Sequence, residues 1–349
     1  MAVRLDPSDE YMHELGPEQN FNESMYINCF DPVNQVGGWF RMGNRANEGT
    51  AEMTVCLYLP PAPGDAGGTR RVGFMFKRPA IANNDVLAGA GLTWTMVRPF
   101  EELRVDYTGK ILVLDEPEQM AEPRRAFRDN PTVDAEIHIT FTGQGRSSMF
   151  GGEPDQPHEA PGEEFAKGHY EQLVHASGTM QVGDEEWSIE GHGLRDHSWG
   201  PRYWQAPWYY RWLTANVSSE FGFMASRVAK KDGPGTRGGF VWENGQMHLC
   251  DDFQLTTTTR GDDQYHDRIE GLLRSSRSGR EWRFSGDVIN LIPLRNRRQD
   301  PDGNWLMTRI SEGMTRWTVQ SGEFAGQTGY GLSEYLDQII DDVPVGLAE

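Results

Sequence analysis

One segment carries the residues with the most evident chemistry, Gly191-His192-Gly193-Leu194-Arg195-Asp196-His197-Ser198-Trp199-Gly200. If residues 194–199 are extended, Arg195, His197 and Trp199 lie on one face of a strand and Asp196 and Ser198 on the other, because side chains alternate along a strand. The first face places an imidazole that titrates near neutral pH beside a large indole surface. We therefore take His197 and Trp199 as candidate catalytic residues, with Arg195 or Asp196 orienting the imidazole.

The segment continues into a run of aromatic residues that we interpret as the wall of an apolar substrate pocket. Its members are Tyr203, Trp204, Trp208, Tyr209 and Trp212. Aromatic side chains most often form a core, and an apolar patch of this kind can instead be the subunit contact of a homodimer. The glycines at positions 191, 193 and 200 indicate close backbone approach or strained turns, which favours a functional site.

Other chemistries fit the segment less well. His192, His197 and Asp196 lack a further ligand at a recognisable spacing, so no metal site is predicted. Ser198 lacks the flanking glycine of a nucleophile elbow, which argues against a serine hydrolase. The sequence has no phosphate loop, dinucleotide fingerprint or Schiff-base signature, so we expect no cofactor.

Charge and composition narrow the class of partner. With 33 basic and 52 acidic residues the formal net charge is -19, which repels nucleic-acid backbones and anionic membrane surfaces. The N-terminal residues lack the apolar core of a signal peptide, and no apolar stretch is long enough to cross a bilayer. We expect a soluble cytoplasmic protein that binds a hydrophobic small molecule, with no nucleic acid and no stable membrane insertion. The odd number of cysteines (Cys29, Cys56 and Cys250) predicts buried thiols.

The elements that position the motif are predicted to be β-strands. Period-two alternation is clearest at residues 52–59 and 134–142, where every second residue is apolar. Shorter strands are predicted at residues 72–76, 92–97, 111–114, 178–182, 187–190, 212–217, 221–228, 240–243, 247–257, 268–273, 281–285, 305–310 and 314–319. Asn244-Gly245 supplies the positive φ angles of a two-residue hairpin. One surface helix is predicted over residues 117–128.

The chain length of 349 residues suits two domains of ordinary size. Residues 153–164 are rich in proline, glycine and acidic side chains, which predicts an exposed loop or linker. We place the boundary after it, giving an N-terminal β domain at residues 1–168 and a C-terminal β domain at residues 169–349 that carries the motif. The fold class is therefore all-β, with two antiparallel barrels or sandwiches and few short helices.

The motif resembles the Asp-His-Asn/Ser-Trp-Gly signature of the carotenoid 1,2-hydratase (hydroxyneurosporene synthase) superfamily, whose members are tandem lipocalin-like barrels. Further segments resemble patterns of a less characterised branch of that group, and together with the motif they span most of the chain. They are Glu23-Ser24-Met25-Tyr26, Asp31-Pro32, His169-Tyr170-Glu171-Gln172 and Gly329-Tyr330-Gly331-Leu332-Ser333-Glu334-Tyr335. Only the central motif is specific. The resemblance implies two lipocalin-like β domains.

The resemblance also implies a chemistry. In the hydratase a carboxylic acid protonates an isolated carbon-carbon double bond, and a motif histidine and tryptophan, which correspond to His197 and Trp199, help to stabilise the carbocation that water traps. An apolar pocket raises the pKa of a carboxyl group so that it stays protonated, and indole faces hold a cation without reacting with it. Other members resemble pericyclases, which fold a polyene for cycloaddition.

The hydratase carries its acid and a tyrosine on the strand after the motif, whereas residues 221–227 here contain neither. Asp196, Glu243, Asp251 and Asp252 are candidate replacements that the sequence does not rank. We predict a cofactor-independent enzyme acting on a hydrophobic isoprenoid, terpenoid or polyene substrate by acid-assisted hydration, isomerisation or cyclisation, in an aromatic pocket between the domains. The alternatives are a pericyclase and a non-catalytic carrier of a lipid or terpenoid.

Overall fold

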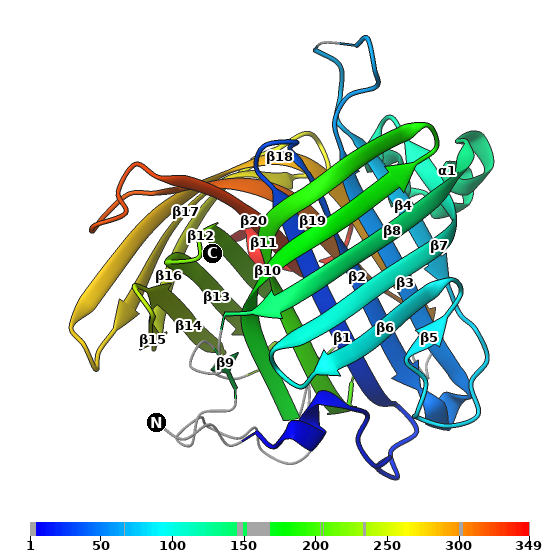
Figure 1. Ribbon diagram of the computed structural model, residues 1–349, viewed down its shortest axis with the longest axis horizontal. Helices are drawn as coiled ribbons and strands as arrows, with labels where there is room; N and C mark the ends of the chain where they lie inside the picture. The colour runs from blue at the N-terminus through cyan, green and yellow to red at the C-terminus, as the bar shows by residue number, and fades with distance from the viewer. Residues whose placement is uncertain are drawn as a thin grey trace. The chain divides into compact units, whose positions relative to one another are not determined.

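Two antiparallel sheets account for most of the chain in the computed structural model, which describes residues 5–348 except 66, 145–148, 152–167, 203, 205, 233–234 and 300–302. The chain divides into two units, the first comprising Met1–Asp115 and Phe127–Tyr203 and the second Glu116–Ala126 and Trp204–Glu349. Each unit is built on one of the sheets (Figure 1). The all-β prediction with two lipocalin-like β domains is therefore confirmed.

The sheet of the first unit closes on itself. Its strands follow the order β4-β3-β2-β1-β11-β10-β8-β7-β6-β5, β4 also pairs with β7, and the short β9 pairs with β10. Their bounds are β1 Phe21–Asp31, β2 Val36–Arg45, β3 Thr50–Leu59, β4 Arg71–Lys77, β5 Ala88–Gly89, β6 Leu92–Arg98, β7 Glu102–Leu114, β8 Thr132–Gly143, β9 Met149–Phe150, β10 Gly168–Val182 and β11 Glu185–Pro201.

The sheet of the second unit follows the order β15-β14-β13-β12-β20-β19-β18-β17-β16, with β21 paired to β20. Its strands are β12 Tyr209–Ser218, β13 Phe221–Ala229, β14 Thr236–Glu243, β15 Gln246–Cys250, β16 Asp252–Arg260, β17 Tyr265–Ser275, β18 Arg280–Gln299, β19 Trp305–Val319, β20 Thr328–Ile340 and β21 Val343–Pro344. Short helices complete the chain: the 3-10 helices η1 Pro7–Glu10, η2 Ala46–Glu48, η3 Pro117–Ala121 and η5 Val345–Ala348, and the α-helix α1 Pro123–Asp129.

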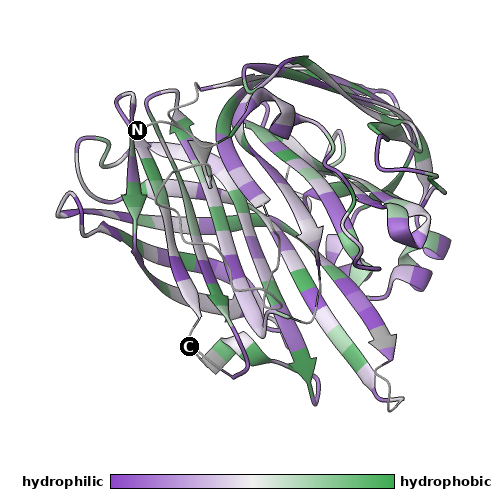
Figure 2. Ribbon diagram, turned by 90° about the horizontal axis from the view of Figure 1, so that it is seen from below, coloured by the Kyte–Doolittle hydropathy of each residue, from purple (hydrophilic) through white to green (hydrophobic). Residues whose placement is uncertain are grey.

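Alternating side chains build a core within each unit. In β3 the predicted inward set, Met53, Val55, Leu57 and Leu59, lies in the core of the first unit with Met25, Ile27 and Phe40. Figure 2 shows the resulting succession of hydrophobic and hydrophilic residues along many strands. A second core, which includes Leu213, Phe223, Phe284 and Trp317, fills the second unit. Apolar burial on the inner face of each sheet is therefore what selects the strand registers.

Every predicted strand lies in strand structure, several as parts of longer strands, but residues 247–257 are divided into β15 and β16 at Asp251, and residues 305–310 and 314–319 belong to one strand, β19. The Asn244-Gly245 hairpin is confirmed, with positive φ at both residues and Glu243 paired to Gln246. The predicted helix is interrupted at Glu122, so that η3 and α1 replace one continuous helix; Pro123 begins α1, as expected for a residue that cannot continue a preceding helix. The three cysteines are buried thiols, as predicted.

The predicted domain boundary after Gly168 falls inside the first unit. β10 and β11 follow the acidic segment, and β11 pairs with β1 at the start of the chain. This long-range pairing places β10 and β11 in the first unit. The predicted loop at residues 153–164 lies outside the described residues. Among the residues that are described, no helix combines the length and apolar character needed to span a membrane.

Candidate active site

Strand β11 carries the motif through the middle of the first unit's sheet, between β1 and β10. His197 is directly opposite Met25 on β1 and Tyr170 on β10, and directly opposite residues share a face of the sheet. Since Met25 belongs to the core, the face that carries His197 is the inner face. The predicted grouping of Arg195, His197 and Trp199 on one face is therefore confirmed.

Glycines allow this strand to approach its neighbour closely, as predicted. A Cβ atom on Gly191 would stand 2.2 Å from the carbonyl oxygen of Phe30, and one on Gly193 would stand 1.7 Å from that of Asn28. Gly200 has a φ of 124°, which disfavours any residue with a side chain. The glycines thus hold β11 against β1, which is the strand that carries Glu23.

Glu23 joins two histidines in the interior of the first unit. His197 donates from Nε2 to Glu23 Oε1 over 2.6 Å, and His13 donates from Nδ1 to the same oxygen over 2.8 Å. The other carboxylate oxygen accepts from the backbone N–H of His13 and from Asn84. His13 also stacks on Trp199, with ring centroids 3.7 Å apart and an interplanar angle of 12°.

The electrostatics of this cluster are dominated by the Glu23 carboxylate. Burial alone would raise the pKa of Glu23, but hydrogen bonds and charge from His13 and His197 lower it to about 2, so the group is ionised at neutral pH. Burial opposes the charged form of His13, yet Glu23 and Asp9 raise the pKa of its imidazole above the usual value. The buried Nδ1 atom of His197 has no hydrogen-bond partner among the described residues.

A second buried network lies beside the first. Arg195 donates to Glu10 Oε2 over 2.7 Å and to the Tyr170 hydroxyl over 2.8 Å. Tyr170 in turn donates to Glu10 Oε1 over 3.3 Å, and the backbone N–H of Phe100 donates to Glu10 Oε2 over 2.6 Å. Burial raises the pKa of Tyr170 well above its usual value, so the phenol stays protonated.

Asp196 points to the opposite face of β11. It accepts a 2.5 Å hydrogen bond from His169 Nε2, and Glu171 lies 3.4 Å from the same nitrogen. Burial would lower the pKa of His169, but the two carboxylates raise it to about 10. Neither Asp196 nor Arg195 orients the His197 ring, contrary to the sequence interpretation; that contact is made by Glu23.

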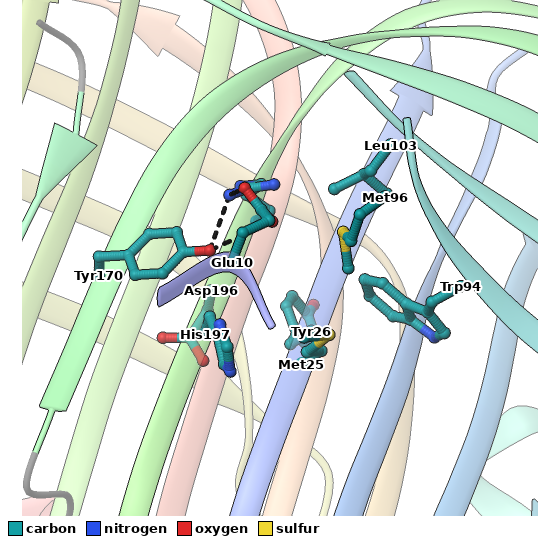
Figure 3. A pocket seen from close by; sticks show the side chains of 10 residues that line it. Glu10, Met25, Tyr26, Trp94, Met96, Leu103, Tyr170, Asp196 and His197 are labelled. Atoms are coloured by element: carbon teal, nitrogen blue, oxygen red, sulfur yellow. Dashed lines mark hydrogen bonds and ion pairs between the residues drawn. The ribbon is translucent and has the colours of Figure 1, made fainter. Parts of the chain in front are cut away.

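A small cavity adjoins both networks. It is lined by Glu10, Met25, Tyr26, Trp94, Met96, Leu103, Tyr170, Arg195, Asp196 and His197, all in the first unit. Figure 3 shows the carboxylate of Glu10 and the hydroxyl of Tyr170 facing each other, with Trp94, Met96 and Leu103 across the space. The cavity measures about 10 Å³, which is room for about one water molecule.

Four residues of the predicted aromatic wall, Trp204, Trp208, Tyr209 and Trp212, belong to the second unit and do not line this cavity. Trp204 and Trp208 are partly buried, and Trp208 carries Lys231 over its ring at 5.4 Å. On β12, Tyr209 is buried. Trp212 is partly buried and precedes the core residue Leu213, so its side chain lies on the other face of the strand. Tyr203 lies outside the described residues. Their role as substrate contacts remains a prediction.

The candidate acids of the second unit have other partners. Glu243 forms an ion pair with Arg280, and Asp251 accepts from Ser276. Asp252 pairs with Arg274 and Arg237. Of the four proposed replacements, only Asp196 is among the residues around the cavity, and its carboxylate points to the opposite face of β11, toward His169. The structure instead places two further carboxylates, Glu10 and Glu23, within hydrogen-bond reach of the motif.

Two clusters contain residue types that hold metals. In one, the ligand atoms of His13, Glu23 and His197 lie within 4.8 Å of one another; in the other, so do those of His169, Glu171 and Asp196. A histidine pair with one carboxylate is a known arrangement for transition metals. In the first cluster both imidazoles already donate to Glu23 Oε1, so each of these two contacts contains a proton rather than a metal ion.

Several of these residues escaped the sequence interpretation. Glu10 and His13 lie in a segment with no recognisable motif, and nothing in one sequence places them near position 197. Glu23 and Tyr170 lie in the segments that resemble the hydratase superfamily, so the resemblance marked them without indicating a role. The register of β1, β10 and β11 brings those separate segments together.

Comparisons with known proteins agree with this architecture. The family model described as "Domain of unknown function (DUF7064)" matches residues 6–339. No curated protein sequence matches the chain significantly. Kievitone hydratase from Nectria haematococca is similar in structure, with a TM-score of 0.53, 13% identity, and coverage of 90% of this chain and 88% of that one. A protein from Nitrosomonas europaea assigned as AttH has the same score and identity, covering 96% and 99%. At this identity the likeness establishes the fold.

Proposed function

Since this chain belongs to the DUF7064 family, we propose from its own site that it is a cofactor-independent enzyme that moves a proton on a hydrophobic substrate, by acid-assisted hydration, isomerisation or cyclisation. The observation that carries the proposal is His197. Its ring lines the cavity, is fixed through Nε2 by an ionised carboxylate, and has an unpartnered Nδ1. In the neutral ring that geometry puts the proton on Nε2 and the lone pair on Nδ1, which is the form of a general base.

Tyr170 is the candidate hydrogen-bond donor that complements this base. Its ring lies edge-on to His197 with centroids 5.5 Å apart, and its hydroxyl accepts a hydrogen bond from Arg195. A protonated phenol beside a guanidinium can donate a hydrogen bond that stabilises an oxygen gaining negative charge. A base and a hydrogen-bond donor therefore lie beside one small space, which supports proton transfer in hydration or isomerisation.

The substrate class follows from the remaining lining. Met25, Trp94, Met96 and Leu103 supply apolar surface, and Trp94 provides an indole. Trp199 lies behind this lining: its ring centroid is 5.3 Å from that of His197, and it stacks on His13. Indole faces stabilise a passing positive charge without reacting with it. An isoprenoid, terpenoid or polyene fits this chemistry, in line with the resemblance of the motif to the carotenoid hydratase superfamily. Kievitone hydratase, which shares the fold, is a hydratase by name.

Turnover of a substrate panel tests the proposal. Linear terpenoids and polyenes are incubated with the protein in ¹⁸O-labelled water and, separately, in D₂O, and the products are analysed by mass spectrometry. Hydration places ¹⁸O in the product, isomerisation or protonation-driven cyclisation in D₂O places deuterium on carbon, and a pericyclic reaction does neither.

His197→Ala is the decisive variant, because it removes the base while leaving the rest of the lining. Its matched control is His138→Ala, which removes an exposed imidazole on β8 of the same unit. We expect loss of turnover in the first and none in the second. Turnover that survives in His197→Ala without label in the product indicates a pericyclase. A ligand from the host that stays bound and unchanged, with no turnover across the panel, indicates a carrier.

A further inference from the structure

The carboxylate of Glu10 occupies a site whose groups are arranged for an anion. Three donors converge on it: the guanidinium of Arg195, the hydroxyl of Tyr170 and the backbone N–H of Phe100. We call these three groups the carboxylate cradle. The guanidinium and the N–H contact one oxygen and the hydroxyl contacts the other, so both oxygens of a single carboxylate are satisfied.

Backbone strain supports a functional purpose for the cradle. Phe100 has a φ of 61°, in the left-handed region that residues with a Cβ rarely adopt. Gln172 donates to the carbonyl oxygen of Phe100 over 2.9 Å and so holds this conformation in place. The N–H of the same residue is thereby fixed where it meets Glu10. Conformations of this kind persist where the surroundings impose them, and they gather at ligand sites.

Glu10 reaches the cradle from outside the sheet. It ends η1, in a segment of residues 6–14 that we call the N-terminal strap, and the described part of the strap pairs with no strand. The strap is held by Glu10, by His13 at Glu23, and by Asn84, which donates to the His13 carbonyl. The backbone N–H of His13 also donates to Glu23, and Met12 packs against the core, whereas the backbone–backbone hydrogen bonds of the strap are local turns. Displacing it therefore breaks no strand ladder.

The surroundings of the cradle match an amphipathic molecule. Tyr170 lies on one side, and the apolar side chains of Trp94, Met96 and Leu103 lie on the other (Figure 3). Arg195 is on the side of Tyr170, to whose hydroxyl it donates. The cavity in this state is about 10 Å³, far too small for a substrate. Withdrawal of the Glu10 side chain adds its own volume to that space and exposes the cradle at one end of it.

We propose that the carboxylate cradle binds the carboxylate of the substrate, and that Glu10 fills it when no substrate is bound. The inference rests on the proposed function and narrows its substrate to an apolar chain or ring system ending in one carboxylate. Exchange of one carboxylate for another keeps the buried charge of Arg195 compensated, as a buried guanidinium requires. A diphosphate would bring more negative charge than one guanidinium offsets.

Binding of a fluorescent polyene acid tests the competition. The probes are cis-parinaric acid and its methyl ester, titrated into wild type, Glu10→Gln and the matched control Glu14→Gln, which alters an exposed carboxylate of the same strap. We expect Glu10→Gln to bind the acid at least tenfold more tightly than wild type, with no such gain for the ester. Glu14→Gln should equal wild type. Adding Arg195→Gln to Glu10→Gln should abolish the preference for acid over ester.

Two further measurements keep the test decisive if Glu10→Gln folds poorly. Glu10→Asp keeps the charge but shortens the reach, so it should bind the acid more tightly than wild type. In the wild type, saturating acid should speed hydrogen exchange of the strap amides, whereas the ester should not. Equal binding of acid and ester in both variants, or unchanged exchange of the strap, overturns the inference. Acid binding at the cradle without turnover of any polyene would leave it standing while refuting the proposed function.

Discussion

Glu23 and His197 are 174 positions apart in the chain, yet the carboxylate oxygen of one lies 2.6 Å from the imidazole nitrogen of the other in the interior of the first unit. The contact depends on β1 pairing with β11, which sets Glu23 opposite Trp199 and Met25 opposite His197. The motif histidine therefore has its orienting partner on a different strand rather than in its own sequence neighbourhood.

Glu23→Gln should impair activity more than any other conservative change in this cluster. The amide keeps the size of the side chain but removes the charged acceptor that fixes the His197 ring through Nε2. Loss of that support costs about 10²-fold or more in turnover, and breaking the charged hydrogen bonds costs roughly 1–3 kcal/mol of stability. Steady-state kinetics on an accepted substrate and urea unfolding measure both.

Glu52→Gln is the matched control for that variant. Glu52 is also buried in the first unit and forms ion pairs with Arg41 and Arg78, away from His197. The Glu52→Gln variant should lose stability but keep its turnover. Equal loss of activity in the two variants would mean that Glu23 acts only through folding.

The pair of His169 and Asp196 should make stability sensitive to alkaline pH. The folded pKa of His169 is about 10, against 6.5 for the free side chain. A raised pKa contributes stability that is complete below pH 6.5 and disappears as the pH rises from 6.5 to 10. Asp196→Asn removes the main favourable partner, so the variant should lose less stability than wild type between pH 7 and 9.5.

Urea unfolding midpoints at the two pH values measure this difference. Asp106→Asn serves as the comparison, because Asp106 pairs with the exposed His138 and solvent screens that contact. Its pH dependence should stay near that of wild type. A decline in Asp196→Asn as steep as in wild type would show that the pair contributes nothing to alkaline stability.

Gly193→Ala should separate the two strands that build the site. The added Cβ would stand 1.7 Å from the carbonyl oxygen of Asn28, a backbone atom that cannot move without its strand. The cost is about 3 kcal/mol, the upper end for overpacking, and the shift moves His197 away from Glu23. Gly49→Ala, where φ is 72° and no atom lies within 4 Å, should cost about 1 kcal/mol and spare activity. Thermal unfolding and turnover that fail to distinguish the two would count against this packing.

Chelation should leave activity unchanged. Glu23 Oε1 already accepts from both imidazoles of its cluster, and the proposed chemistry uses the unshared Nδ1 of His197. Dialysis against EDTA, followed by elemental analysis and assay, checks this. A stoichiometric divalent metal whose removal abolishes turnover would assign the cluster of His13, Glu23 and His197 to metal binding instead.

Alternation predicted strands in which apolar residues occupy every second position, whether one face is buried, as in β8, or both, as in β3. β3 and β8 could be predicted as strands because apolar residues alternate with other residues along them. β1 and most of β2 are buried throughout, and their polar side chains, such as Glu23 and Asn28, are inside. Glu23 interrupts the apolar series in β1, so alternation did not predict this strand or a role for its carboxylate.

The site likewise contains residues that alternation could place and residues that it could not. Residues on β11 share one segment, and alternation placed Arg195, His197 and Trp199 on one face correctly. Glu10 and His13 reach them from a segment without regular strand structure, through contacts that only the folded chain creates. The interpretation that Asp196 or Arg195 orients His197 failed because nearness in sequence took the place of pairing across strands.

The pairing of β1 with β11 also determines when the first sheet can be completed during synthesis of the chain. On a ribosome β1 emerges early, but its partner follows only after residue 185. Until then the edge of β1 that will face β11 exposes unpaired backbone N–H and C=O groups, which can pair with another chain. Pairing over so long a loop slows folding and exposes the nascent polypeptide to aggregation. The protein's yield in a cell should therefore depend on translation speed and on chaperones that shield this first strand.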